Sequence, residues 1–256
     1  MNRQISSALA LAMLAPSFGW AACDLKSGPK TAALVELYTS EGCSSCPPAD
    51  KRLSQLPSGR YTYEQVVPIS LHVAYWDYMG WKEPFAQTRF SERQSWLVHA
   101  NGHTTVYTPH FFVSGVEVRD WGADLARELD RVGAETARAS VRIHAEPTAS
   151  GKLSVSASAS APSSPEQLAL FVALTEDGIA SRVSAGENSG STLPHDHVVR
   201  EWIGPIALSG GHAEVERAVT PGSSWNRAEL GIVGFVQDMK TGHVLQAVGA
   251  SQCLRS

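Results

Sequence analysis

Two cysteines separated by two residues are the strongest chemical signal in the sequence. The stretch TSEGCSSCPP (39–48) places Cys43 and Cys46 between an apolar run and a segment with helical spacing. A thiolate, rather than a thiol, attacks a disulfide, and the free amides and dipole at a helix N-terminus lower the pKa of a thiol. We therefore expect Cys43 to be the nucleophile and Cys46 the resolving thiol of a dithiol/disulfide exchange.

The same two cysteines allow other interpretations. They could form an inert disulfide, but so short a loop restricts the unfolded chain little. With His72 or His110, their thiolates could instead bind Cu(I) or Zn²⁺. Redox activity is favoured over both, and we predict neither a bound metal nor a cofactor.

Glu36 is a candidate for proton transfer. It lies inside the apolar run 32–38, where an unpaired carboxylate is costly. Burial raises the pKa of a carboxyl group, so Glu36 could shuttle the proton of Cys46. The alternative is a glutamate that pairs with a basic residue.

A strand, a tight turn and a helix are expected around the cysteines. The run 32–38 has strand composition, and Ala49, Leu53 and Leu56 recur at helical spacing after Cys46. The two prolines that follow Cys46 are tolerated because amides in the first turn of a helix have no intrahelical partner.

Further elements extend this unit. We predict a strand over 66–73, a helix over 87–101, a hairpin over 111–118 and a helix over 121–132. Thr108-Pro109 precedes the hairpin, where a cis bond would be a costly and therefore purposeful feature.

Two other groups of side chains are assigned structural roles. Trp76, Tyr78 and Trp81 could line a substrate groove, but aromatic clusters mostly fill cores, and packing is favoured. His195 and His197 alternate along a predicted strand and could bind a metal. Because the sequence suggests no third metal ligand, a structural role is favoured for both histidines.

The pattern of the sequence changes near residue 138. Short segments of strand character, several of them alternating, are separated by Gly, Ser, Pro and Asn clusters, which is typical of a β-sandwich. The segment 184–192 is expected to be a flexible loop. The predicted strands are 140–146, 153–160, 168–176, 197–204, 213–220, 229–238 and 243–251.

The N-terminus has the features of an export signal. Arg3 precedes the apolar run 8–15, and Gly19 and Ala21 are the small residues expected before a cleavage site. Residues 1–21 are thus predicted to be a signal peptide, which indicates a periplasmic or secreted protein. No other segment resembles a membrane span.

Composition limits the classes of partner. The 256 residues carry a net charge of -4, which gives no basic field for nucleic acid. Of the four cysteines, Cys23 and Cys253 can close a disulfide near the two ends of the chain. The alternative, lipidation of Cys23 after the sequence WAAC, would leave Cys253 as an odd thiol.

Five stretches resemble one family. The chain is similar to the secreted proteins of the DUF1223 family and, more broadly, to the thioredoxin superfamily. This resemblance implies that Thr108-Pro109 forms a cis-proline loop beside the cysteines and offers a backbone edge to an extended substrate. The matching stretches are VELYTSEGCSSCPPAD, LHVAYWDYMGWKEPF, RFSERQ, VYTPHFFVSG and HDHVVREWIG.

The predicted organisation is a thioredoxin-like domain over 30–137 followed by an immunoglobulin-like β-sandwich over 138–253. The predicted function is thiol–disulfide exchange on protein or small thiols, with an unknown redox partner. A Cu(I)-binding or redox-sensing protein that uses the same cysteines is one alternative. An envelope assembly module, in which the sandwich acts and the cysteines only close a loop, is another.

Overall fold

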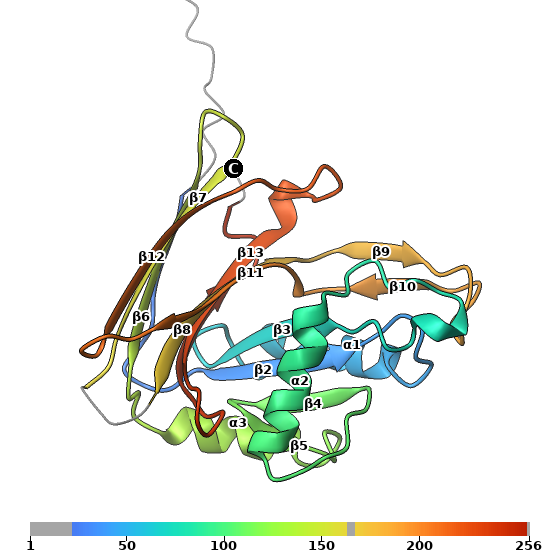
Figure 1. The fold of residues 1–256 in the computed structure, drawn as a ribbon, viewed down its shortest axis with the longest axis horizontal. Coiled ribbons are helices and arrows are strands. Elements are labelled where there is room, and N and C mark those ends of the chain that lie inside the picture. The colour runs from blue at the N-terminus through green and yellow to red at the C-terminus, as the bar shows by residue number, and fades with distance from the viewer. Residues whose placement is uncertain (1–21, 163–166, 255–256) are drawn as a thin grey trace, which may run out of the picture.

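The computed structural model describes residues 22–162 and 167–254. The predicted export signal, residues 1–21, lies outside the described residues. The described residues form a mixed fold that is mostly β, with three sheets (Figure 1). Among the described residues, no helix has the length and apolar character needed to cross a membrane.

An eight-stranded sheet forms the centre of the molecule, in the order β14-β13-β8-β11-β3-β2-β4-β5. Parallel pairing joins β2 to β3 and β3 to β11, and the other neighbours are antiparallel. Its strands are β2 (Ala33–Thr39), β3 (Val66–His72), β4 (His110–Val113), β5 (Val116–Val118), β8 (Leu168–Glu176), β11 (Val198–Ala207), β13 (Leu230–Asp238) and β14 (Val244–Ala250).

Two smaller sheets accompany it. Four antiparallel strands, in the order β1-β6-β7-β12, are β1 (Cys23–Lys26), β6 (Ser140–Pro147), β7 (Leu153–Ser160) and β12 (His212–Val219). A separate hairpin pairs β9 (Ile179–Arg182) with β10 (Thr192–His195).

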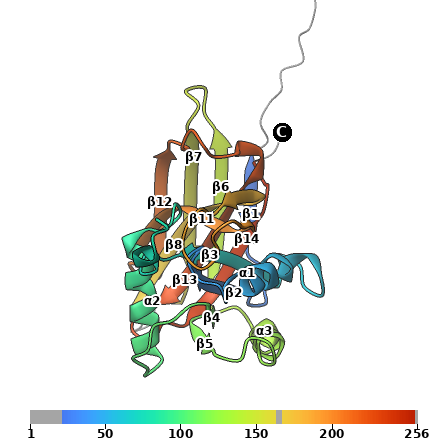
Figure 2. The same ribbon diagram turned by 90° about the vertical axis from the view of Figure 1, so that its right-hand side faces the viewer.

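Helices cover the part of the large sheet that carries the cysteines (Figure 2). α2 (Thr88–Ala100) packs Phe90 and Leu97 on one face. α1 (Pro47–Ser54) and α3 (Leu125–Ala134) pack on the other. Short 3₁₀ turns, η1 (Leu56–Ser58), η2 (Asp77–Met79) and η3 (Arg227–Glu229), lie in the connections.

The alternation of side chains along β8 explains how the four-stranded sheet packs on the eight-stranded sheet. Leu170 and Val172 face the four-stranded sheet and pack with Ile143 and Val155, whereas Phe171 faces the cluster beneath α2. Two sheets therefore pack face to face at β8, and each of them also contains strands from before residue 138. All seven strands predicted after residue 138 are present within a few residues.

Hydrogen bonds cross the predicted boundary at residue 138. The N-terminal strand β1 pairs with β6, and the amide of Ser70 in β3 donates to the carbonyl oxygen of His197 just before β11. The sequence analysis missed β1, β9 and β10. The hairpin predicted at Ser114-Gly115 is confirmed, with φ angles of 47° and 86° at these two residues.

Candidate redox site

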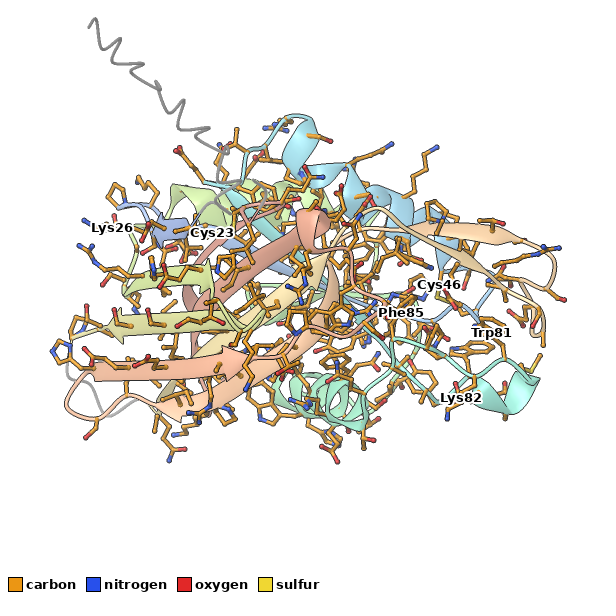
Figure 3. The ribbon with its side chains drawn as sticks, turned by 90° about the horizontal axis from the view of Figure 1, so that it is seen from above. Cys23, Lys26, Cys46, Trp81, Lys82 and Phe85 are labelled. Carbon is orange, nitrogen blue, oxygen red and sulfur yellow. A yellow bond between two sulfur atoms is a disulfide. The ribbon has the colours of Figure 1, made fainter. Side chains whose placement is uncertain are left out.

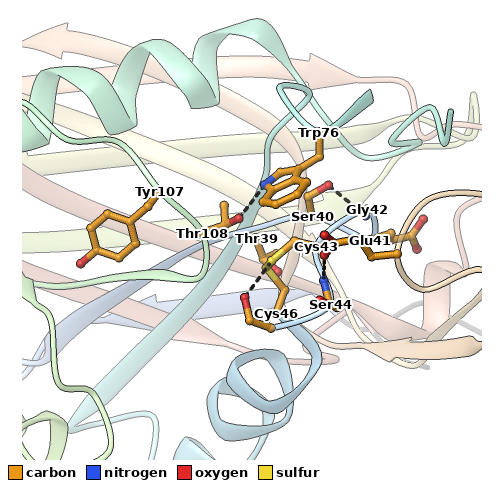
Figure 4. The surroundings of a disulfide bond; sticks show 12 residues. Thr39, Ser40, Glu41, Gly42, Cys43, Ser44, Cys46, Trp76, Tyr107 and Thr108 are labelled. Carbon is orange, nitrogen blue, oxygen red and sulfur yellow. Dashed lines mark hydrogen bonds between the residues drawn. A yellow bond between two sulfur atoms is a disulfide. The ribbon is translucent and has the colours of Figure 1, made fainter. Parts of the chain in front are cut away.

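Cys43 and Cys46 lie where β2 passes into α1. A disulfide joins them, and both side chains are fully buried (Figure 4). The carbonyl oxygen of Cys46 accepts the amides of Ala49 and Asp50, which fixes Cys46 as the residue that begins the helix. The two cysteines thus occupy the strand-to-helix turn that the sequence predicted, at the positive end of the helix dipole, although Pro47 and Pro48 offer no free amide there.

Thr108 and Pro109 lie beside this turn. β4 runs antiparallel to β2 with Tyr38 opposite His110, so the residues before β4 sit near the end of β2. The Thr108-Pro109 bond is cis. Trp76 connects the two segments, because its Nε1 donates to Thr108 Oγ1 at 2.7 Å (Figure 4).

Gly42 permits this close packing. A Cβ added at Gly42 would lie 3.0 Å from Cβ of Trp76, closer than ordinary side-chain contacts. A larger residue here would push Trp76 away from Thr108.

A loop from the C-terminal half of the chain packs on the turn that carries the cysteines. The loop 183–191 connects β9 and β10, and the Nδ2 of Asn188 donates to the carbonyl oxygens of Glu41 and Cys43, both at 2.9 Å. In the same loop, Glu187 accepts the amide of Ser44 at 2.8 Å. The predicted flexible loop is therefore part of the site.

Glu36 lies on the opposite face of β2 from the helix that follows the cysteines. Its two oxygens accept hydrogen bonds from Arg93 of α2 at 2.7 and 2.9 Å, and Tyr38 also donates to it. Thr39, three positions along the strand, faces α1 instead. The contacts of Glu36 match the alternative in which it pairs with a basic residue.

Asp50 is a buried acid of α1, on the same side of β2 as the cysteines, and the sequence analysis missed it. It follows Cys46 by one helical turn, and its Oδ2 accepts a hydrogen bond from Thr39 Oγ1 at 3.2 Å. Its Oδ1 is buried without a hydrogen-bond partner among the described residues. Burial raises the pKa of Asp50, and the nearby imidazoles of His72 and His195 oppose this effect. An aspartate four residues after a CxxC is the signal that could have found it, since that spacing places both on one face of a helix.

Asp50→Asn is expected to raise the free energy of unfolding of the oxidised protein at pH 7.5. Because the folded pKa is raised, the folded state resists ionisation of this carboxyl group more than the unfolded state does. Below the unfolded value of about 3.9, both states hold the proton and the penalty is absent. The penalty grows as pH rises from there through the folded pKa.

The gain should be about 1–3 kcal/mol at pH 7.5, the usual desolvation cost of a buried group that lacks compensation, because the substitution removes the charge that is costly to bury. It should vanish at pH 3.5. Urea unfolding at the two pH values measures it, with the exposed Asp130→Asn as the control. An equal gain at both pH values would contradict the assignment.

Two histidine–carboxylate pairs surround Asp50. His72 Nδ1 lies 3.0 Å from Glu83 Oε1, and His195 Nε2 lies 2.9 Å from Glu41 Oε1. Burial alone would lower the pKa of His72, but Glu83 raises it above its ordinary value. The pKa of Glu83 is lowered because its pairing with His72 outweighs its own burial. The second ring nitrogen of each histidine is buried without a hydrogen-bond partner among the described residues.

The two histidines considered as metal ligands have other contacts. Both ring nitrogens of His110 are occupied, by Gln94 and Glu117, and burial lowers its pKa. His72 pairs with Glu83. Within residues 22–162 and 167–254, no group of three or more His, Cys, Asp or Glu side chains is arranged to hold a metal ion.

Two smaller expectations were wrong. Tyr78 does not fill the core: it is 77% exposed and stacks on Trp76 beside the site. His195 and His197 do not share a strand, because β10 ends at His195 and His197 adopts a φ of 59° in the turn before β11. His197 pairs with Asp177, away from the partner of His195.

Comparison with solved structures shows what the fold resembles. Protein AGR_C_4864 from Agrobacterium tumefaciens is 24% identical with a TM-score of 0.64, covering 87% of this chain and 95% of that chain. HBP35 of Porphyromonas gingivalis is 16% identical with a TM-score of 0.66, covering 88% of this chain and 76% of that chain. At these identities the likeness concerns the fold alone.

A search of curated protein sequences found no match. The sequence model of one family, described as "Protein of unknown function (DUF1223)", matches residues 34–237, which include the cysteines, the Thr108-Pro109 loop and the loop that covers them. Since the match extends over most of the chain, this protein belongs to the DUF1223 family.

Proposed function

We propose that this protein is an exported thiol–disulfide exchange protein that acts through Cys43 and Cys46, in a thioredoxin-like unit followed by a β-sandwich. The observation that carries the proposal is the disulfide at the first turn of α1, beside Thr108 and Pro109. Two disulfides, Cys23–Cys253 and Cys43–Cys46, are typical of proteins outside the cytoplasm and support export to the periplasm or beyond.

The exchange transfers two electrons in two steps. A substrate thiolate attacks Cys43 Sγ, the bond between Cys43 and Cys46 breaks, and Cys46 leaves as a thiolate that takes up a proton. A second substrate thiolate then attacks the substrate sulfur of the mixed disulfide and releases the Cys43 thiolate. The substrate dithiol is thereby oxidised to a disulfide, and the protein is reduced. In the reverse direction Cys43 attacks a substrate disulfide and Cys46 resolves the intermediate.

Asp50 is assigned to the proton of Cys46. It is the buried acid one turn along the same helix, and burial raises its pKa, so it can exchange a proton closer to neutral pH than an exposed aspartate. Glu36 is engaged by Arg93 on the other face of β2. The Cys43 thiolate needs no such base because it lies at the helix N-terminus.

The test is the reduction potential of the Cys43/Cys46 pair together with exchange by two serine variants. The potential is expected between about -120 and -270 mV, the span of known exchange proteins. Cys43→Ser should reduce exchange to the uncatalysed background. Cys46→Ser should still attack a substrate disulfide and accumulate the mixed disulfide, which mass spectrometry detects.

Other outcomes would count against exchange. A pair that stays oxidised below about -300 mV behaves as a structural disulfide. Tight Cu(I) binding by the reduced protein without exchange would indicate metal binding by the same cysteines.

A further inference from the structure

The disulfide is closed to substrates in this structure. Cys43 and Cys46 have no exposed surface, whereas a reactive cysteine is normally at least partly exposed. For the proposed exchange to occur, the residues that cover Cys43 must move. The covering segment and its contacts therefore decide which thiols can react.

The loop 183–191, which we call the flap, lies directly on the backbone of the cysteine turn, where it contacts Glu41, Cys43 and Ser44. It comes from the C-terminal part of the chain and packs on the segments around Gly42 and Gly80: a Cβ at Gly186 would lie 3.6 Å from Gly42 Cα, and one at Gly80 would lie 3.8 Å from Ala185 Cβ. Figure 3 shows Cys46, Trp81 and Phe85 at one side of the molecule, away from Cys23.

The hairpin that carries the flap is suited to open. Among the described residues, β9 and β10 pair only with each other, and each has four residues. A two-stranded hairpin is marginally stable without further packing. The buried contact between His195 and Glu41 holds the base of the hairpin, so the flap can move while its base stays in place.

Asn188 holds the flap on the cysteine turn through its side-chain amide, which donates hydrogen bonds as a backbone amide would. Its side-chain amide donates to two backbone carbonyl oxygens, those of Glu41 and Cys43. Once Asn188 leaves, the carbonyl group of Glu41 needs a new donor, and that of Cys43 keeps only the amide of Cys46. Carbonyl groups that lose their donors are costly in a covered site. A peptide substrate can supply backbone N–H groups to them. A small thiol without an amide cannot.

We propose that Asn188 is a specificity-determining residue: it keeps the flap closed over Cys43 and yields to cysteines in extended polypeptides in preference to small thiols that lack amides. This inference rests on the proposed function and assigns its substrate class. The substrate segment displaces Asn188 and replaces its two hydrogen bonds, while a small thiol must open the flap without compensation.

The test uses the full-length mature protein in its oxidised form and two uncharged monothiols. One is a blocked tripeptide, acetyl-Gly-Cys-Gly-amide, and the other is 2-mercaptoethanol. The initial rate at which each opens the disulfide is measured by acid quenching, alkylation and mass spectrometry of the mixed disulfide. Each rate is divided by the concentration of the thiolate form, so that the different thiol pKa values do not enter.

In the wild type the tripeptide should react faster than 2-mercaptoethanol. Asn188→Ala should raise the rate of the reaction with 2-mercaptoethanol about tenfold, since each lost hydrogen bond changes the rate by a factor of a few. The rate with the tripeptide should rise less than about threefold, because the tripeptide already replaces those hydrogen bonds. Asn188→Leu, which has a similar volume and lacks the donor without adding a charge, should behave in the same way.

Asn226→Ala is the matched control. Asn226 caps η3 through a hydrogen bond with Ala228 and contacts none of the cysteine loop, so both rates should stay at the wild-type value. The proposal is overturned if the Asn188 variants leave both rates unchanged or accelerate both thiols equally. These rates are properties of the oxidised protein. A reduction potential outside the exchange range would thus reject the proposed function. It would not change the measured effect of Asn188 on the two reaction rates.

Discussion

Removal of the Cys23–Cys253 disulfide is expected to lower the free energy of unfolding by about 5 kcal/mol. The two cysteines are 230 positions apart, so their bond closes almost all of the described residues into one loop. In the chain-entropy account, the stabilisation grows with the logarithm of loop length because the cross-link removes conformations from the unfolded state. Urea unfolding of the Cys23→Ser/Cys253→Ser double variant measures the loss.

The second disulfide provides the comparison. Cys43 and Cys46 are three positions apart, and the same account gives about 2 kcal/mol for the Cys43→Ser/Cys46→Ser variant. Equal losses in the two double variants would contradict the assignment of separate roles. The difference matters for function, because reduction of a disulfide costs whatever stability it provides. The Cys43/Cys46 pair can change redox state at a smaller cost to folding, as an exchange protein requires.

The local pattern around the cysteines was sufficient to predict the elements that carry them. The apolar run before Cys43 and the helical spacing after Cys46 are short-range signals, and both appear in the structure as β2 and α1. The alternating segments after residue 138 likewise became strands. What the sequence did not reveal was their pairing: β11 joins β3, so strands far apart in the chain share one sheet.

The candidate site was only partly predictable for the same reason. The sequence singled out Cys43, Cys46, Thr108 and Pro109 because their spacing or type is distinctive, and the structure brings these residues together. Asn188 was missed, since a polar residue in a Gly- and Ser-rich segment is usual for a surface loop. Its role depends on where the hairpin β9–β10 folds back. Asp50 and the two histidine–carboxylate pairs come together only through contacts between separate elements.

Arg93 shows how the two halves of the chain depend on each other. From α2 it holds Glu36 of β2 and donates to Oε1 of Gln237 of β13 at 2.9 Å. Its guanidinium also lies 5.0 Å from the ring centroid of Trp202 and 5.3 Å from that of Phe171. One buried cation thus contacts strands from both sides of residue 138.

Arg93→Met is expected to lower the free energy of unfolding by about 3–5 kcal/mol, the usual cost of removing one partner from a buried ion pair. The change leaves the fully buried Glu36 carboxylate without its cation. Urea unfolding measures the effect. The matched control is Arg127→Ala, whose exposed pair with Asp124 should be worth less than about 1 kcal/mol. A loss of that small size in Arg93→Met would contradict the structural role of the pair.

A double variant separates the two possible roles of Glu36. Glu36→Leu/Arg93→Met removes both charges, and apolar side chains of similar volume often replace a buried ion pair with little loss. The double variant should therefore be more stable than Arg93→Met alone. If Glu36 only balances Arg93, the folded double variant keeps its disulfide exchange, because Asp50 still serves Cys46. If exchange slows while the fold is retained, Glu36 takes part in proton transfer, and the assignment of that role to Asp50 must be revised.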